Sequence, residues 1–136
     1  MAKTDRNDLT PIFEKLKRIF QPYAKHMDVV HNTANYYLLN TRYIMKNNQP
    51  LCFGGVRLGK NYVSVYLMSV YALPQEAKTI SSELRKRMQG KSCFNFKQVD
   101  DKLFAELARL IKAGAARFSD KEFIDKLRKK QDSAQS

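Results

Sequence analysis

The chain lacks tryptophan and has little cysteine, proline or glycine. Its 136 residues include no Trp, two Cys, four Pro and five Gly. Two cysteines, Cys52 and Cys93, are too few for the disulfide framework of a small secreted protein, so we expect two reduced, buried thiols. No internal repeat, linker or low-complexity stretch interrupts the sequence. We therefore expect a single domain over residues 1–136, with its core at about 10–118.

Long apolar runs are also missing. No window approaches the roughly 20 consecutive apolar residues that a membrane-spanning helix needs. The first eight residues alternate charges and lack the apolar centre of a signal peptide. We expect a cytoplasmic protein with no membrane partner.

Acidic residues are scarce: 13 Asp and Glu stand against 25 Lys and Arg, which gives a net charge of +12. Such an excess attracts nucleic acids, anionic ligands and acidic proteins. The densest excess is at Arg85, Lys86, Arg87, Lys91 and Lys97. The first four predict a nucleic-acid or acidic-protein surface, as an alternative to a merely solubilising one, although Arg85, Lys86 and Arg87 span only part of a helical turn and cannot all face one groove.

Recognisable catalytic and metal-binding motifs are absent from the sequence. There is no CxxC, and His26 and His31 lie on either side of an expected change from helix to strand, which is poor spacing for a metal site. Cys93 with His31 is the one nucleophile–base pair to consider, and sequence gives no geometry for it. Gly59-Lys60 lacks the spacing and the strand-to-helix context of a phosphate-binding loop. We predict a binding protein rather than an enzyme, with no catalytic residues, no metal and no cofactor.

What the chain does contain is apolar periodicity, with 43% hydrophobic residues. The first pattern predicts a helix after Thr10 as N-cap and Pro11 at the first helical position, ending or kinking near Pro22. Its apolar face comprises Ile12, Phe13, Leu16, Ile19, Phe20 and Tyr23.

Residues 27–72 are rich in Val, Tyr, Thr and Phe and predict strands. Residues 36–39 leave few polar positions on either face, which predicts burial on both sides, by the chain's own helices or by a second protomer. The clearest hairpin joins 51–58 to 61–68 through a type II′ turn at Gly59-Lys60. Its register places Arg57, Gly55 and Phe53 opposite Tyr62, Ser64 and Tyr66 on a polar surface, and Val56, Gly54 and Cys52 opposite Val63, Val65 and Leu67 on the core surface. Close helix packing is expected over Gly54 and Gly55.

The C-terminal half predicts helices around one short strand. A helix follows Ser81 or Ser82 as N-cap, with Leu84 and Met88 inward and Gly90 as a left-handed cap. A strand at 92–96 turns Phe94 and Phe96 inward. Asp100 caps a long helix, and Ser119 with Glu122 forms a capping box for a last helix at about 120–130. The long helix has an apolar stripe of Leu103, Phe104, Leu107, Leu110, Ile111, Ala115 and Phe118.

These patterns predict a two-layer α+β fold with a mostly antiparallel sheet packed on helices, in the order helix, strands, helix, strand, helix, helix. The polar face of the sheet is the candidate site for a small anionic or planar ligand, and a solvated face decorated with tyrosine is the alternative. The candidate residues are Arg57, Tyr62, Ser64 and Tyr66, joined by Lys91, Cys93 and Asn95 if the late strand enters the sheet with that side outward.

Three segments resemble the YdhG-like domain-of-unknown-function family: 53–57 (FGGVR), 59–64 (GKNYVS) and above all 86–96 (KRMQGKSCFNF). The resemblance covers about residues 10–118 and implies a two-layer α+β fold. Because some YdhG-like proteins are described as frataxin-like iron chaperones, it also implies iron as a possible cargo. Iron delivery of that type needs clustered carboxylates, yet the opening helix offers only Glu14 beyond Asp8.

Overall fold

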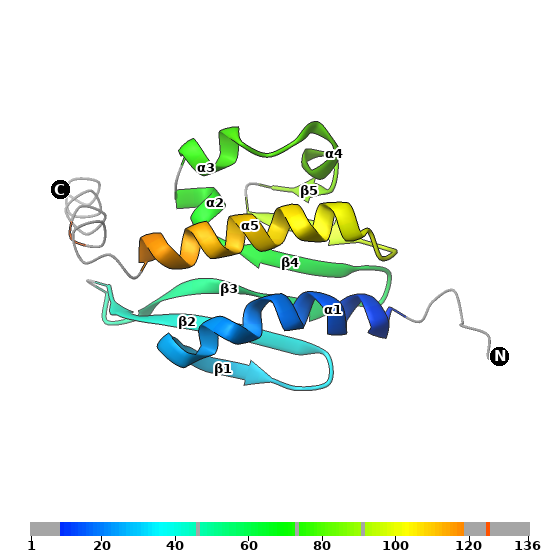
Figure 1. Cartoon of the computed structure of the whole chain (residues 1–136). Helices are drawn as coiled ribbons and strands as arrows, with labels where there is room; N and C mark the ends of the chain where they lie inside the picture. The colour runs from blue at the N-terminus through cyan, green and yellow to red at the C-terminus, as the bar shows by residue number, and fades with distance from the viewer. Residues whose placement is uncertain (1–8, 46, 73, 91, 119–124, 126–136) are drawn as a thin grey trace.

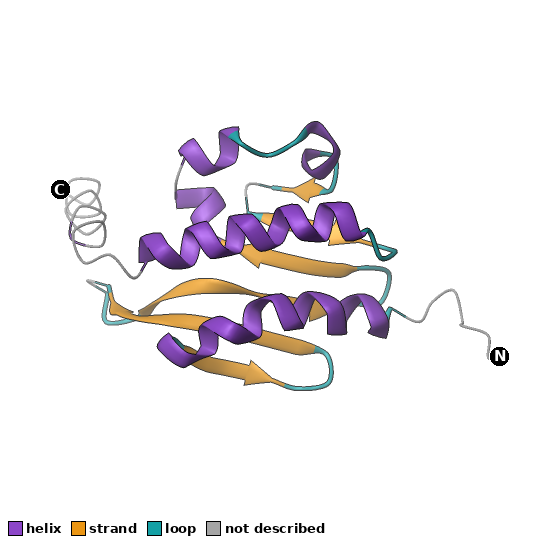
Figure 2. Cartoon of the chain, in the orientation of Figure 1, coloured by secondary structure: helices purple, strands orange, loops and turns teal. Residues whose placement is uncertain are grey.

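Two helices lie side by side on one face of a six-stranded antiparallel sheet (Figures 1 and 2). The structure is a computed structural model that describes residues 9–45, 47–72, 74–90, 92–118 and 125. The sheet has the strand order β1-β2-β3-β4-β6-β5. The elements are α1 (Thr10–Phe20), a 3₁₀ turn η1 (Gln21–His26), β1 (Asp28–Asn32), β2 (Tyr36–Ile44), β3 (Pro50–Leu58), β4 (Val63–Leu67), α2 (Met68–Ala72), α3 (Pro74–Lys78), α4 (Ser82–Arg85), β5 (Met88–Gln89), β6 (Cys93–Phe96) and α5 (Asp101–Phe118). The α+β prediction is confirmed.

Helix α1 buries the face that its periodicity predicts and ends where Pro22 requires. Ile12, Phe13, Leu16 and Phe20 are buried, and the chain tightens into the 3₁₀ turn η1 at Gln21. The predicted cap at Thr10 is wrong by one residue. Leu9 takes that position, and it has no side-chain hydrogen bond to the helix. Its side chain is buried in the core, and its carbonyl accepts the amides of Ile12 and Phe13, both at 3.1 Å.

The region between β4 and β6 differs from its prediction. Strand structure stops at Leu67 rather than near residue 72, since Met68 opens helix α2. Ser81 is the N-cap of α4, and its hydroxyl accepts the amide of Leu84 at 3.1 Å. The helix does not extend to Met88, which instead belongs to strand β5. Gly90 does have a left-handed φ of 75°, but it serves the turn between β5 and β6 rather than a helix end.

The β3–β4 hairpin has a four-residue loop, 59–62, instead of the predicted two-residue turn. Leu58 pairs with Val63 and Arg57 with Ser64, so the predicted register is wrong by two residues. A shift of two leaves every β4 side chain on its predicted face, because side chains alternate with period two. Tyr62 moves into the loop. Gly59 is required there for space, since an added Cβ would lie 2.8 Å from the Tyr62 carbonyl oxygen.

A β-bulge in β3 puts two further residues, Phe53 and Cys52, on faces of the sheet other than those predicted. Leu39 pairs with Gly54 and Asn40 with Cys52, so Phe53 is an extra residue on that strand. For the residues of β3 that precede Gly54, the bulge reverses which side chains point to which face of the sheet. Phe53 is fully buried and packs its ring edge-on against Phe20 at 6.2 Å, whereas Cys52, predicted in the core, is half-buried. Side-chain alternation alone does not reveal such an insertion.

Close helix packing is confirmed at Gly54, where the Phe20 ring lies 3.3 Å from the position a Cβ would take. Gly55 points to the other face, where Leu38 lies beside it. Strand β2 buries only one face, with Tyr37 and Leu39 inward and Tyr36 and Leu38 half-exposed. The expected burial of this strand on both sides is therefore wrong for the chain by itself.

Helix α5 completes the layer that covers the sheet. The carboxylate of Asp100 accepts the Leu103 amide at 3.1 Å, and every member of the predicted apolar stripe is buried. The capping box at Ser119 and Glu122 and the helix at about 120–130 lie outside the described residues, apart from Asp125. Within the ranges that the structure describes, no helix is long and apolar enough to cross a membrane.

Candidate ligand site on the open sheet face

We call the sheet face opposite α1 and α5 the open face, and no long helix of the described residues packs on it (Figure 1). Pairing between strands puts exposed and half-buried side chains of five strands on this face. Strand β6 enters the sheet next to β4, and its Phe94 and Phe96 are buried while Cys93 and Asn95 point outward. The predicted polar face therefore exists, and the late strand belongs to it.

A pocket of about 440 Å³ opens at the end of this face where two turns meet. The Leu58 amide donates to the Asn35 carbonyl at 2.7 Å, which joins the β1–β2 turn to the start of the β3–β4 loop. We call this hollow the turn pocket. Its lining is Asn35, Arg57, Leu58, Gly59, Lys60, Asn61, Tyr62 and Ser64. Three of the predicted ligand-binding residues, Arg57, Tyr62 and Ser64, are thus brought together.

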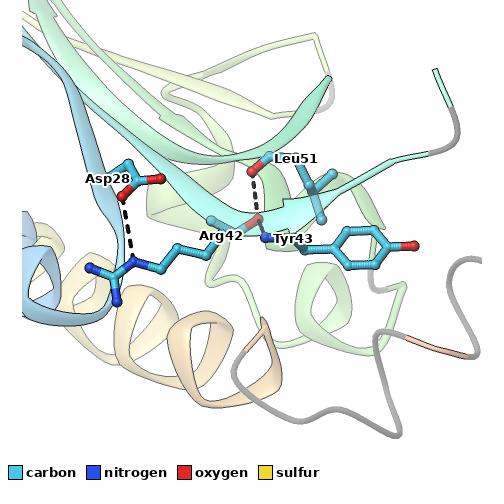
Figure 3. A network of polar contacts seen from close by, with 5 residues as sticks. Asp28, Arg42, Tyr43 and Leu51 are labelled. Atoms are coloured by element: carbon cyan, nitrogen blue, oxygen red, sulfur yellow. Dashed lines mark hydrogen bonds and ion pairs between the residues drawn. The ribbon is translucent and has the colours of Figure 1, made fainter. Parts of the chain in front are cut away.

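Among the described residues of its lining, the turn pocket has two cationic side chains, Arg57 and Lys60, and no carboxylate. Neither cation forms an ion pair with a carboxylate of the described chain. Elsewhere on the open face, Arg42 pairs with Asp28 at 3.4 Å (Figure 3). A second pocket, of about 570 Å³, sets Glu83 and Asp100 beside its own cations. Positive charge is therefore less compensated in the turn pocket than at these two places.

A stack of side chains crosses three strands beside the turn pocket. The rings of His31 and Tyr36 lie 4.5 Å apart and 14° from parallel, and the Arg57 guanidinium carbon lies over the Tyr36 ring at 5.8 Å. His31 and Arg57 are exposed and Tyr36 is half-buried. Such stacking holds a guanidinium group without occupying its hydrogen-bond donors. We call these three side chains the surface stack.

The remaining open-face candidates lie further along the sheet. Ser64 donates to the Asn95 side-chain oxygen at 2.7 Å, and the Asn95 amide donates to Gln89 at 2.6 Å, so Asn95 links three strands. Tyr66 is the pairing partner of Cys93, beyond the turn pocket. Lys91 lies outside the described residues.

The basic cluster predicted for nucleic acid is at and just after α4, near the sheet edge formed by β5 and away from β1 (Figure 1). The Arg85 guanidinium donates hydrogen bonds to the carbonyls of Ala77 and Ile80, at 3.0 and 3.4 Å. Lys86 is 4.0 Å from Glu83, and Arg87 is half-buried. Two of the three described members are therefore engaged within the fold.

The structure separates the one nucleophile–base pair considered from the sequence. Cys93 is on β6 and His31 on β1, and three strands lie between them in the sheet. The four steps from β1 to β6, at about 4.8 Å each, separate the two strands by roughly 19 Å. That distance excludes proton transfer between these two residues. Across the described ranges, no three His, Cys, Asp or Glu side chains gather as a metal ion would require.

Sequence reasoning missed five residues around the site: His31, Asn35, Tyr36, Lys60 and Asn61. The Gly59-Lys60 turn was visible in the sequence, and a longer loop would have placed Lys60 and Asn61 beside Arg57. Asn35 and the surface stack depend on the pairing of β1, β2 and β3, which no local pattern specifies. Comparisons of this chain with protein-family models, with curated proteins and with solved structures found no match.

Proposed function

We propose that the protein binds a small anion in the turn pocket. The observation that carries the proposal is the convergence of Arg57 and Lys60 in a hollow whose described lining includes no carboxylate. A guanidinium fork and an ammonium group are the side chains that recognise carboxylate and phosphate oxygens. The hydroxyls of Tyr62 and Ser64 and the amides of Asn35 and Asn61 add neutral hydrogen-bonding groups around them.

The supporting strands favour a preformed site. Arg57 is on β3, paired on both sides by β2 and β4, and its guanidinium is held over Tyr36. Ser64 is the direct partner of Arg57 on β4. Residues on paired strands lose less conformational freedom on binding than residues on a free loop. Lys60, at the loop tip, adds charge with a flexible reach.

The proposal is of binding without catalysis. The pocket's described lining has the hydroxyls of Tyr62 and Ser64 and the amine of Lys60, but no Cys, His or carboxylate that would serve as a base to activate them. The YdhG-like family membership, a cytoplasmic location and a cofactor-free state stay predictions. Iron delivery also stays a prediction, and the described residues offer no cluster of carboxylates that supports it.

The test is a titration of the ¹⁵N-labelled protein with pyrophosphate, followed by NMR amide shifts. We expect the largest shifts at Asn35 and at residues 57–64. Because a hydrogen bond to a charged group is worth about 1.5–3 kcal/mol, Arg57→Gln and Lys60→Gln should each weaken binding by about tenfold to a hundredfold. Arg117→Gln, an exposed cation on α5, is the control matched in charge. Equal losses in all three variants would mean that pyrophosphate senses only the net charge.

A second surface supports the nucleic-acid or acidic-protein alternative. Lys86, Arg87 and Lys102 line the pocket of about 570 Å³ between α4 and the start of α5. Glu83 and Asp100 share that lining and reduce its positive potential. We rank this surface below the turn pocket for that reason. The Arg57 variant distinguishes the two, since Arg57 is not part of the lining of this second pocket.

A further inference from the structure

The turn pocket combines charge with planar side chains, and this combination restricts the kind of anion that suits it. Building on the proposed anion site, we propose that its ligand is the phosphate ester of a nucleoside. The base stacks in the pocket against the Tyr62 ring and the face of the Arg57 guanidinium, while the N–H donors at the edge of that guanidinium and the Lys60 ammonium group meet the phosphate. Free nucleotides and single-stranded nucleic acid share this chemistry.

The surface stack is the first observation behind this inference. Aromatic rings that pack inside a core are explained by burial, but His31 and Arg57 are exposed, and Tyr36 is only half-buried. Their stacking contacts hold the guanidinium of Arg57 from the Tyr36 side. A guanidinium that is held in place has less freedom to lose when a flat ring stacks on its other face.

The pocket lining is the second observation. Tyr62 borders the same hollow as Arg57, so a ring inside it has an aromatic and a guanidinium neighbour. Nucleobases stack on aromatic rings and on arginine planes alike. The side-chain amides of Asn35 and Asn61 carry both donors and acceptors, as the edges of bases do. A volume of about 440 Å³ is within the range of small-ligand sites.

Charge supports a phosphate ester over a neutral ring. Arg57 and Lys60 are both in the lining, and none of the pocket's described residues is a carboxylate that would repel a phosphate. The loop that carries Lys60 is at the end of the sheet, while the rest of the open face continues past Ser64 towards β6. One nucleotide therefore fits the pocket alone, and a longer strand has a surface along which to continue.

The experiment compares ribose 5-phosphate with adenosine 5′-monophosphate by isothermal calorimetry at about 0.15 M salt, where surface charge is screened beyond roughly 8 Å. Stacking makes the nucleotide bind about fivefold to a hundredfold tighter than the sugar phosphate. Tyr62→Leu brings the ratio of the two affinities down to about one, whereas Tyr62→Phe, which lacks the same hydroxyl, keeps the ratio, because the ring rather than the hydroxyl does the stacking. Tyr66→Leu, on the open face beyond the pocket, is the matched control and changes neither affinity.

Each outcome separates this inference from the proposed function. Equal affinities for the two probes in the wild-type protein overturn the nucleoside and leave the anion site standing. Binding of neither probe, together with the absence of pyrophosphate shifts, overturns both. A single-stranded decamer of deoxyadenosine, measured at the same salt, distinguishes the sources. If it binds more tightly than the mononucleotide, the ligand is a strand, and if it binds no more tightly, the ligand is a free nucleotide.

Discussion

At the scale of single residues, the two cysteines were expected to be buried, and neither is. Both are free thiols and half-buried. The Cys52 sulfur lies 3.7 Å from the Leu39 carbonyl oxygen on the neighbouring strand. Burial raises the pKa of Cys52 to about 11, against a hydrogen bond from the Gly54 backbone that lowers it. The thiolate is therefore scarce at neutral pH, and Cys52 is a poor nucleophile there.

We expect alkylation of Cys52 by iodoacetamide to be slow at pH 7 and to accelerate up to about pH 11. The experiment uses Cys93→Ser, so that Cys52 is the only thiol. Urea denaturation of the same variant supplies the reference for an unfolded, readily alkylated thiol. A rate that levels off near pH 9 in the folded protein would show that burial does not raise the pKa of this thiol.

The raised pKa of Cys52 also makes the free energy of unfolding decrease at high pH. The pKa of Cys52 is higher in the folded protein than the ordinary value of 9.0 for a cysteine, so the folded state holds the proton more tightly. Its contribution is complete below pH 9 and is lost as the pH rises towards 11. Cys52→Ala should reduce the loss of stability over that interval, measured by urea denaturation at several pH values.

At the scale of elements, a buried carboxylate holds the short helix α4 against α5. Glu106, 8% exposed, accepts the Ser81 amide at 2.8 Å and the Ser81 hydroxyl at 2.6 Å. The same hydroxyl caps α4 through the Leu84 amide. A helix of four residues has too little hydrogen bonding of its own to persist. Its position depends on Leu84, which is fully buried, and on this carboxylate.

Replacement of Glu106 by Ala should therefore lower the free energy of unfolding by about 1–3 kcal/mol, the cost of leaving the donors of the half-buried Ser81 unpaired. Urea denaturation measures the loss, and Ser81→Ala should produce part of it. Lys112→Ala, an exposed change on the same helix, is the control and should cost less than about 0.5 kcal/mol. A Glu106 variant as stable as the control would mean that water replaces the carboxylate.

Elements with a clear apolar period could be predicted from the sequence. Helices α1 and α5, with 11 and 18 residues, are long enough for the helical period to be read, and the four residues of β6 alternate strictly between polar and buried side chains. Helices α2 and α3 have five residues each, and β5 has two, so their formation depends on tertiary packing. The loop length after Leu58 and the bulge at Phe53 are likewise set by neighbouring strands.

The candidate site was partly predictable, because side-chain alternation along a strand fixes which residues share a face. Arg57, Ser64 and Tyr66 keep their predicted face because a register shift of two preserves the alternation. Tyr62 joined the pocket although its predicted partner was wrong. Asn35 could not be found, because it reaches the site through a turn between two other strands.

At the scale of the whole molecule, the positive net charge and the open sheet edge have opposite effects on self-association. β1 forms one edge, and its Val29 and Val30 are 44% and 45% exposed. The strand has no Lys, Arg or Pro to discourage pairing, although a bulge between Val29 and His31 disturbs its register. The net charge of +12 keeps copies of the protein apart in dilute salt.

We therefore expect self-association to rise with salt, as screening shortens the range of repulsion to about 3 Å at 1 M. Sedimentation velocity at about 0.05 M and 1 M salt measures it, at equal protein concentration. Val30→Lys places a charge on the edge and should keep the protein monomeric in both buffers. Salt-dependent association that persists in Val30→Lys would assign the contact to another surface.

The strand order has a consequence for how the protein is made. Strands β1 to β4 are neighbours in the order of synthesis, so their loop closures are short and we expect them to pair early. The cover for the second half of the core comes last, since Phe104 packs on Phe96 and Phe118 on Phe53. Until translation passes Phe118, the part of the sheet that α5 covers is therefore an exposed apolar surface in the nascent chain. During that interval we expect chaperone contact and aggregation to be most frequent.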